Sequence, residues 1–112
     1  MAKLAFWITA GPSLADKALA NLVLASRLQE NRGQDVEVYF FGPGVELAGH
    51  AEGPVAEVLA TLKNHSVPVG ACPANANQYE VATVLTEQGV KMEPAGEALV
   101  RLVEKGYQII GV

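Results

Sequence analysis

The sequence predicts an α/β domain with a five-stranded, mainly parallel sheet. Short apolar runs rich in β-branched and aromatic residues alternate with longer stretches of helical period, which is typical of a parallel sheet with crossover helices. The runs are almost continuously apolar, as expected for strands that helices cover on both faces. Glycine follows three of the four predicted helices, where a left-handed residue commonly ends a helix.

One domain spanning residues 1–112 is expected, because a chain of 112 residues is long enough for one hydrophobic core. The composition is 50% hydrophobic and 18% charged, which is richer in apolar residues than an average soluble domain. We expect part of this excess to cover a subunit interface.

Five runs are predicted to form the strands. They are Leu4–Thr9, Val36–Phe41, Val67–Ala71, Val90–Met92 and Tyr107–Val112. The opening segment Met1–Ala10 places a charge before an apolar run, as a signal peptide does. It is short, has no clear cleavage pattern and leads into a capped helix, so we interpret it as the first strand. No apolar segment approaches the length that crosses a bilayer.

Four stretches are predicted to form the helices. They extend from Ser13 to just before Gly33, from Pro54 to His65-Ser66, from about Asn75 to Gln88, and from about Ala95 to Lys105. Ser13 is the expected N-cap of the first helix, with Asp16 three residues on as in a capping box. Pro54 suits the first position of a helix, because its missing N–H would have no intrahelical partner there.

Charge and motifs exclude several functions. The net charge of −4 is spread along the chain without a Lys/Arg cluster, which argues against a nucleic-acid partner. The turn at Gly11–Lys17 lacks the ending of a phosphate-binding loop, and no GxGxxG follows the first strand. His50, His65 and one cysteine match no zinc spacing, so we expect no metal and no cofactor. A lone cysteine forms no internal disulfide, which favours a cytoplasmic protein without membrane association.

The turns after the first three strands are expected to share one edge of the sheet, where binding sites of open parallel sheets gather. They are Gly11-Pro12-Ser13, Gly42-Pro43-Gly44 and Cys72-Pro73. The stretch Gly42–Gly53 is the longest one without a predicted element, and Gly42 and Gly44 would allow a tight turn. It is a candidate wall or lid of a site. Glycines that only shape a turn are the alternative.

Cys72 is the only cysteine and follows the third predicted strand. With Pro73 at the first helical position, Cys72 becomes the N-cap, beside the free N–H groups of Ala74 and Asn75. The helix dipole and these donors favour the thiolate, which is the nucleophilic form of cysteine. The alternative is a buried, inert cysteine that packs as a small hydrophobic residue.

Several segments together resemble the DsrE/DsrF-like family, which includes TusD-like proteins of sulfur relay. They are Lys3–Thr9 with its glycine turn and long Ala/Leu helix, Val36–Phe41 followed by Gly42–Leu47, and Val69–Cys72, and the likeness extends to Tyr107–Val112. The resemblance implies a three-layer α/β/α domain with a five-stranded parallel sheet. It also implies assembly as a homo-oligomer, either a trimer or a hexamer.

The family's cysteine at the end of the third strand corresponds to Cys72. The resemblance therefore implies a sulfurtransferase or sulfur carrier that holds sulfane sulfur as a persulfide on Cys72. Its partners would be sulfur-donor and sulfur-acceptor proteins, or small polysulfur and thiol compounds. Transfer would be intermolecular, since no second cysteine is present to resolve the persulfide. The candidate binding residues are Gly42, Gly44, Pro73, Ala74 and Asn75.

Two other functions stay open on the residues alone. One is a non-catalytic oligomeric binding or scaffold module in which Cys72 is structural, a function that the high apolar content favours. The other is a redox or peroxide-sensing thiol that forms sulfenic acid at Cys72.

Overall fold

The computed structural model describes all 112 residues and contains one five-stranded sheet. The strands are β1 (Lys3–Ile8), β2 (Asp35–Phe40), β3 (Val69–Ala71), β4 (Lys91–Met92) and β5 (Gln108–Gly111). Their order across the sheet is β4-β3-β2-β1-β5, and every neighbouring pair is parallel. The predicted strand order along the chain and the parallel pairing are confirmed.

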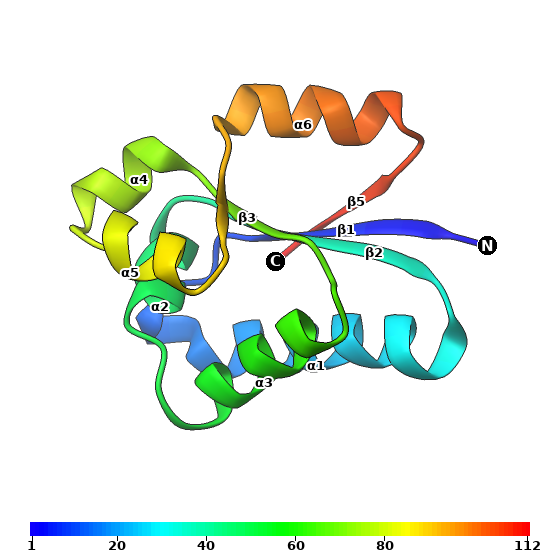
Figure 1. Cartoon of the computed structure of the whole chain (residues 1–112), viewed down its shortest axis with the longest axis horizontal. Coiled ribbons are helices and arrows are strands. Elements are labelled where there is room, and N and C mark those ends of the chain that lie inside the picture. Colours follow the sequence, from blue (N-terminus) through cyan, green and yellow to red (C-terminus); the bar gives the residue numbers. More distant parts are fainter.

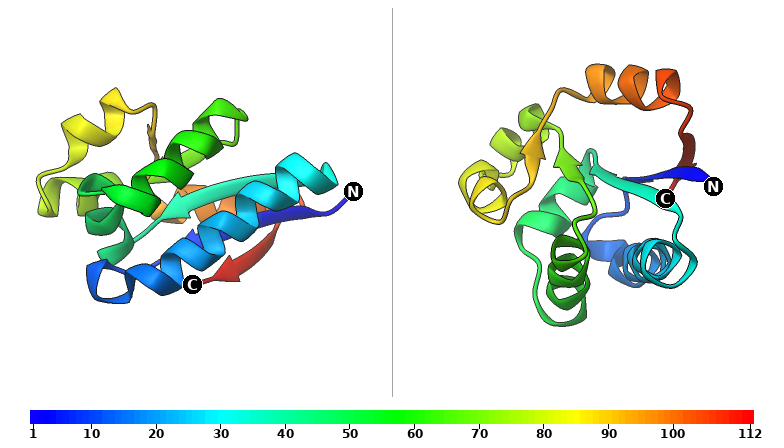
Figure 2. Two further views of the ribbon diagram at one scale, coloured as in Figure 1. Left: turned by 90° about the horizontal axis from the view of Figure 1, so that it is seen from below. Right: turned by 45° about the vertical axis from the view of Figure 1, so that its right-hand side comes forward.

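Helices cover both faces of the sheet, which makes the fold a three-layer α/β/α arrangement (Figure 1). They are α1 (Ala15–Arg32), α2 (Pro43–Gly49), α3 (Gly53–Asn64), α4 (Pro73–Gln78), α5 (Ala82–Glu87) and α6 (Ala95–Glu104). Helices α1 and α3 lie side by side on one face, and α6 alone lies on the other (Figures 1 and 2). The short helices α2, α4 and α5 gather beyond the carboxyl ends of the strands (Figure 1). None of the helices has both the length and the apolar character needed to cross a membrane.

The side chains of the central strands divide between two clusters, because successive residues of a strand point to opposite faces. Phe6, Ile8, Val38 and Phe40 belong to the large core under α1 and α3. Tyr39 belongs to a much smaller cluster with Cys72 and Ala98, under α6. The two faces of the sheet are therefore covered unequally.

The boundaries of two predicted helices agree with the structure to within about one residue, and the first predicted helix agrees at its end but not at its start. The Pro54 helix is α3, and the fourth predicted helix is α6. Gly33 ends α1 in the left-handed conformation, with φ of 63°. Ser13 is not an N-cap, because a 3₁₀ turn over Pro12–Leu14 precedes α1 and no side chain caps either element.

The third predicted helix is two helices, α4 and α5. The chain turns at Glu80, whose φ of 58° is left-handed and breaks the helical path. Backbone bonds from Glu80 N–H to Asn77 C=O and from Val81 N–H to Ala76 C=O close α4 there. Left-handed positions are predicted from glycine in a sequence, and a glutamate gives no such signal, so the break at Glu80 was not predicted.

The segment Gly42–Gly53 is largely helical rather than irregular, because α2 occupies Pro43–Gly49. Proline at its first turn and the apolar Val45, Leu47 and Ala48, all buried, explain the helix. Its seven residues span less than two full turns, too few for a helical period to stand out in the sequence. The segment therefore packs into the core and does not form a free lid.

Candidate functional site

Cys72 lies where β3 meets α4, at the carboxyl edge of the sheet. It is the N-cap of α4, with extended backbone angles and Pro73 at the start of the helix. Its N–H donates to Phe40 C=O at 3.2 Å, and its C=O accepts from Ala76 N–H at 2.9 Å. The backbone at the thiol is therefore held by both the sheet and the helix.

The Cys72 side chain does not cap α4. It makes no hydrogen bond to the first N–H groups of the helix. It packs instead with Tyr39 and Ala98, against which Trp7 and Ala95 also lie. Cys72 is only 7% exposed, and the first turn of α6 covers it.

Tyr39 is the polar neighbour of the thiol. Its hydroxyl donates to Glu93 C=O at 2.6 Å, and its ring stacks on Trp7 with the ring centres 4.4 Å apart. Burial raises the pKa of Tyr39 above its ordinary value, and the nearby Cys72 and Glu93 raise it further. Tyr39 is therefore neutral at physiological pH, and its oxygen can accept a hydrogen bond from a thiol while its proton goes to Glu93.

Arg101 on α6 fixes the segment that holds Tyr39. Its guanidinium reaches Glu93 at 3.0 Å and Glu37 of β2 at 3.1 Å. Hydrogen bonds from Glu93 first, and then Glu37, raise the pKa of Arg101, so the cation is permanent. Planar two-point contacts of this kind are the strong form of charged hydrogen bond. Arg101 thus links the β4–α6 connection to β2 close to the cluster of Cys72, Tyr39 and Ala98.

The turns after the first three strands meet at one edge, as expected from the parallel sheet. Gly42 N–H donates to the Asn75 side-chain oxygen at 2.8 Å, which joins the turn after β2 to α4. Asn75 also donates to the Gln78 side chain at 3.1 Å. A Cβ on Gly11 would lie 2.6 Å from Cβ of Pro43, so the first two turns are in contact.

The predicted site glycines have backbone roles here. Gly42 has φ of 59° and ψ of −135°, which favours glycine, and a Cβ on the buried Gly44 would collide with the carbonyl oxygen of Ile8. Pro73 and Asn75 are partly exposed beside Cys72, and Ala74 is exposed.

The two histidines lie apart from Cys72 in the sequence and form no metal site with it. His50 is exposed, and His65 lies at the far end of α3 within 3.6 Å of Glu30. No three His, Cys, Asp or Glu side chains come together as a metal site.

Sequence reasoning missed Tyr39, Glu93 and Arg101. Glu37 and Tyr39 alternate with Val36, Val38 and Phe40 along β2, and this period of two marks a strand face that differs from the main core. Arg101 lies next to Leu102 on an apolar helix, and Glu93 contributes both its carboxylate, which pairs with Arg101, and its backbone carbonyl, which accepts from Tyr39. No local pattern brings these groups together, because the hydrogen bond from Tyr39 to Glu93 spans 54 residues.

The fold, together with the position of the thiol at the carboxyl edge of the sheet, defines the class of protein. A three-layer α/β/α domain places its one thiol directly after β3, at the carboxyl edge of a parallel sheet. The chain belongs to the DsrE/DsrF-like family, whose profile matches residues 2–112. That family is generally related to sulfur relay.

Solved structures support the fold alone. The YchN protein from E. coli aligns with a TM-score of 0.84 at 17% identity and covers 100% of both chains. A conserved protein of unknown function from Bacteroides thetaiotaomicron, BT1422, aligns with a TM-score of 0.79 at 18% identity, over 96% of this chain and 94% of its own. No functionally curated protein matches the sequence.

Proposed function

We propose that this protein is a sulfur carrier of the sulfurtransferase type that holds sulfane sulfur on Cys72. The observation that carries the proposal is the placement of the only thiol, an N-cap residue at the carboxyl edge with the Tyr39 hydroxyl beside it. Membership of the DsrE/DsrF-like family supports it.

The proposed reaction moves one sulfur atom without net oxidation. The Cys72 thiolate attacks the outer sulfur of a donor persulfide, R–S–SH, and forms a new S–S bond. The bond within the donor breaks, and R–S⁻ leaves with the electron pair. An acceptor thiolate then attacks the outer sulfur of Cys72–S–SH and releases the Cys72 thiolate. Both steps are intermolecular, because the chain has no second cysteine.

Residues around Cys72 have distinct roles in this proposal. Ala74 and Asn75 are proposed to bind the persulfide through the N–H groups at the start of α4. Gly42, Gly44 and Pro73 are proposed to shape the two turns at the edge of the site, and Asn75 keeps the turn after β2 against α4.

The cover over the thiol sets a requirement for this reaction. Since Cys72 is 7% exposed, a donor reaches it only when the start of α6, at Ala95 and Ala98, moves away from the sheet. The backbone carbonyl of Glu93 and its ion pair with Arg101 hold that segment. We infer that donor docking displaces the β4–α6 connection.

Intact mass spectrometry tests the carrier function. After incubation with polysulfide or an organic persulfide, the wild-type protein is expected to gain the mass of one sulfur atom, and the gain disappears on reduction. Cys72→Ser is the matched control and should gain none. If no Cys72-dependent adduct forms with any of several donors, the carrier function is rejected.

The burial of Cys72 favours one other function, a non-catalytic oligomeric binding or scaffold module with a structural cysteine. The rate of alkylation of the native thiol separates the two. A carrier is labelled at a measurable rate in the folded state, and that rate rises with donor-like additives. A structural thiol is labelled only as fast as the protein unfolds.

We also propose that the chain acts as a homo-oligomer, a trimer or a hexamer, in the cytoplasm, with sulfur-donor and sulfur-acceptor partners. The outer face of α6 supports the assembly, because it exposes three aliphatic side chains. They are Leu99, Val100 and Val103, with exposed fractions of 40%, 57% and 57%. Contiguous exposed apolar side chains commonly mark a protein interface.

A further inference from the structure

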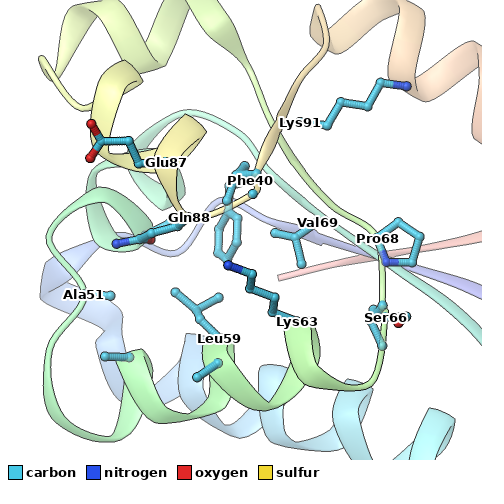
Figure 3. Close-up of a pocket in the computed structure, with 16 residues that line it drawn as sticks. Phe40, Ala51, Leu59, Lys63, Ser66, Pro68, Val69, Glu87, Gln88 and Lys91 are labelled. Carbon is cyan, nitrogen blue, oxygen red and sulfur yellow. The ribbon is translucent and has the colours of Figure 1, made fainter.

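A groove lies on the face of the sheet opposite Cys72. It opens between α3 and the α5–β4 connection, has a volume of about 550 Å³, and is lined mostly by apolar residues (Figure 3). Phe40 and Val69 of the sheet and Leu59 of α3 line it. Small-molecule sites in proteins are of this size and character.

Small side chains create this space. Four alanines from α2, α3 and the segment between them line the groove: Ala48, Ala51, Ala56 and Ala60. A leucine at any of these positions would occupy part of the volume. The groove therefore depends on side-chain size and can be filled by substitution.

Lys63 is the charged group aimed into the groove. Its side chain extends from α3 toward Phe40, whereas Glu87 and Lys91 point away (Figure 3). It crosses to the α5–β4 connection, since a Cβ on Gly89 would lie 3.6 Å from its Cε atom. Lys63 takes no part in the two ion pairs of Arg101 or in the contact between His65 and Glu30.

Gln88, at the end of α5, adds a neutral polar group from the wall of the groove that faces α3 (Figure 3). Its side-chain amide has no hydrogen-bond partner within the chain, and neither does the ammonium of Lys63. Both residues are exposed, so their polar ends lie on the solvent side of the groove. An apolar cleft with a cation and an amide on its solvent side is complementary to a ligand with an aliphatic body and a single anionic end.

We propose that this groove binds a small amphipathic carboxylate, such as a medium-chain aliphatic acid. The aliphatic chain lies against Leu59, Phe40 and Val69, and the carboxylate accepts hydrogen bonds from Lys63 and Gln88. The site is independent of the thiol. Val69 faces the core under α1 and α3, whereas Cys72 faces α6.

Titration with octanoate, followed through the backbone amide signals of isotope-labelled protein, tests the site. Saturable shifts are expected at Leu59, Val69 and Gly89. Lys63→Met keeps the aliphatic stem and removes the charge, and it should weaken binding about tenfold, the scale of one charge-assisted hydrogen bond. Lys17→Met, on the exposed side of α1, changes the net charge equally and should bind as the wild type does.

Two further arms test the groove and the charge. Ala56→Leu should abolish the shifts, and Ala60→Leu, at an exposed position, gives the same test if the first variant folds poorly. Octan-1-ol should bind at least several-fold more weakly than octanoate. The proposal is overturned if octanoate gives no saturable shifts, if Lys63→Met or octanol binds as tightly as the reference, or if the folded leucine variants still bind. Cys72→Ser should bind octanoate normally, which separates this result from the carrier function.

Discussion

At the residue scale, Tyr39 connects the thiol to the polar groups under α6. Its hydroxyl donates to Glu93 C=O, its ring stacks on Trp7, and the residue packs with Cys72. Tyr39 thus holds the β4–α6 connection over Cys72. Removal of its hydroxyl would lower the stability of the fold and increase the exposure of the thiol to reagents.

Tyr39→Phe keeps the ring and removes only the hydroxyl. We expect it to lower the free energy of unfolding by about 1–2 kcal/mol, because Glu93 C=O loses its buried donor. Alkylation of native Cys72 should become faster, since the β4–α6 connection is less firmly held. Denaturant unfolding and thiol labelling measure the two effects.

Tyr79→Phe is the control, because the Tyr79 hydroxyl makes no hydrogen bond in the structure. Slower or equal labelling in Tyr39→Phe would contradict the role of Tyr39 in the cover.

Tyr107 predicts an alkaline dependence of stability. Burial, followed by the charges of Glu37 and Asp35, raises its pKa from 10.0 to about 12 in the folded protein. Between pH 10 and pH 12 the folded chain keeps this proton and the unfolded chain releases it, so stability falls as pH rises through that window. Below pH 10 the contribution is complete.

Tyr107→Phe should flatten this part of the decline. Unfolding free energies measured by denaturant at several pH values across the window give the slope for each protein. The free energies near neutral pH serve as the reference for any pH-independent loss of packing. An equal slope in the variant and the wild type would show that the phenol of Tyr107 does not contribute.

At the element scale, α2 approaches β1 more closely than any side chain would permit. The backbone of Gly44 lies against the carbonyl oxygen of Ile8, and the turn before it needs the positive φ of Gly42. This approach keeps the turn after β2 in contact with α4, where Gly42 N–H donates to the Asn75 side chain.

Two glycine-to-alanine changes at helix starts should therefore have opposite effects. Gly44→Ala is expected to cost about 2–3 kcal/mol, because the new methyl group forces the helix away from β1. Gly96→Ala, in α6 with nothing within 4 Å of its Cβ position, should add about 0.5–1 kcal/mol through helix propensity. Thermal or denaturant unfolding measures whether each change raises or lowers the free energy of unfolding. Stabilisation by both changes would mean that α2 has room to move.

At the scale of the whole molecule, the two faces of the sheet differ. Helices α1 and α3 cover a large apolar core, whereas α6 alone covers a small cluster of aromatic and charged groups (Figure 1). The outer face of α6 is itself apolar, at Leu99, Val100 and Val103. A helix with apolar side chains on its inner and outer faces is expected in a buried layer.

We predict that this outer face is a contact between copies of the chain. The wild type should sediment as a species larger than the 11.8 kDa monomer. The double change of Val100 and Val103 to lysine should shift it toward the monomer with unchanged helical content. Changing Thr83 and Thr86, exposed on α5, to lysine is the matched control. If the oligomer persists in the Val100 and Val103 variant, the contact between copies lies on another surface of the protein.

Local patterns predicted most of the fold. The apolar runs predicted the five strands and the parallel sheet, and Pro54, Gly33 and the helical spacing predicted α1, α3 and α6. The break at Glu80 and the helix α2 were missed, because one depends on a left-handed non-glycine residue and the other is shorter than two turns. Both require tertiary contacts that override local propensity.

The sequence by itself determined that this protein is an α/β domain with Cys72 as the N-cap after its third strand, because strand period, helix period and the position of Pro73 are local properties of the chain. Only the tertiary structure decided that the thiol is covered, and that Tyr39, Glu93 and Arg101 are its neighbours. Arg101 and Glu37 are 64 residues apart in the sequence and Tyr39 and Glu93 are 54 apart. Side chains so distant meet only when the sheet has formed and α6 has packed across it.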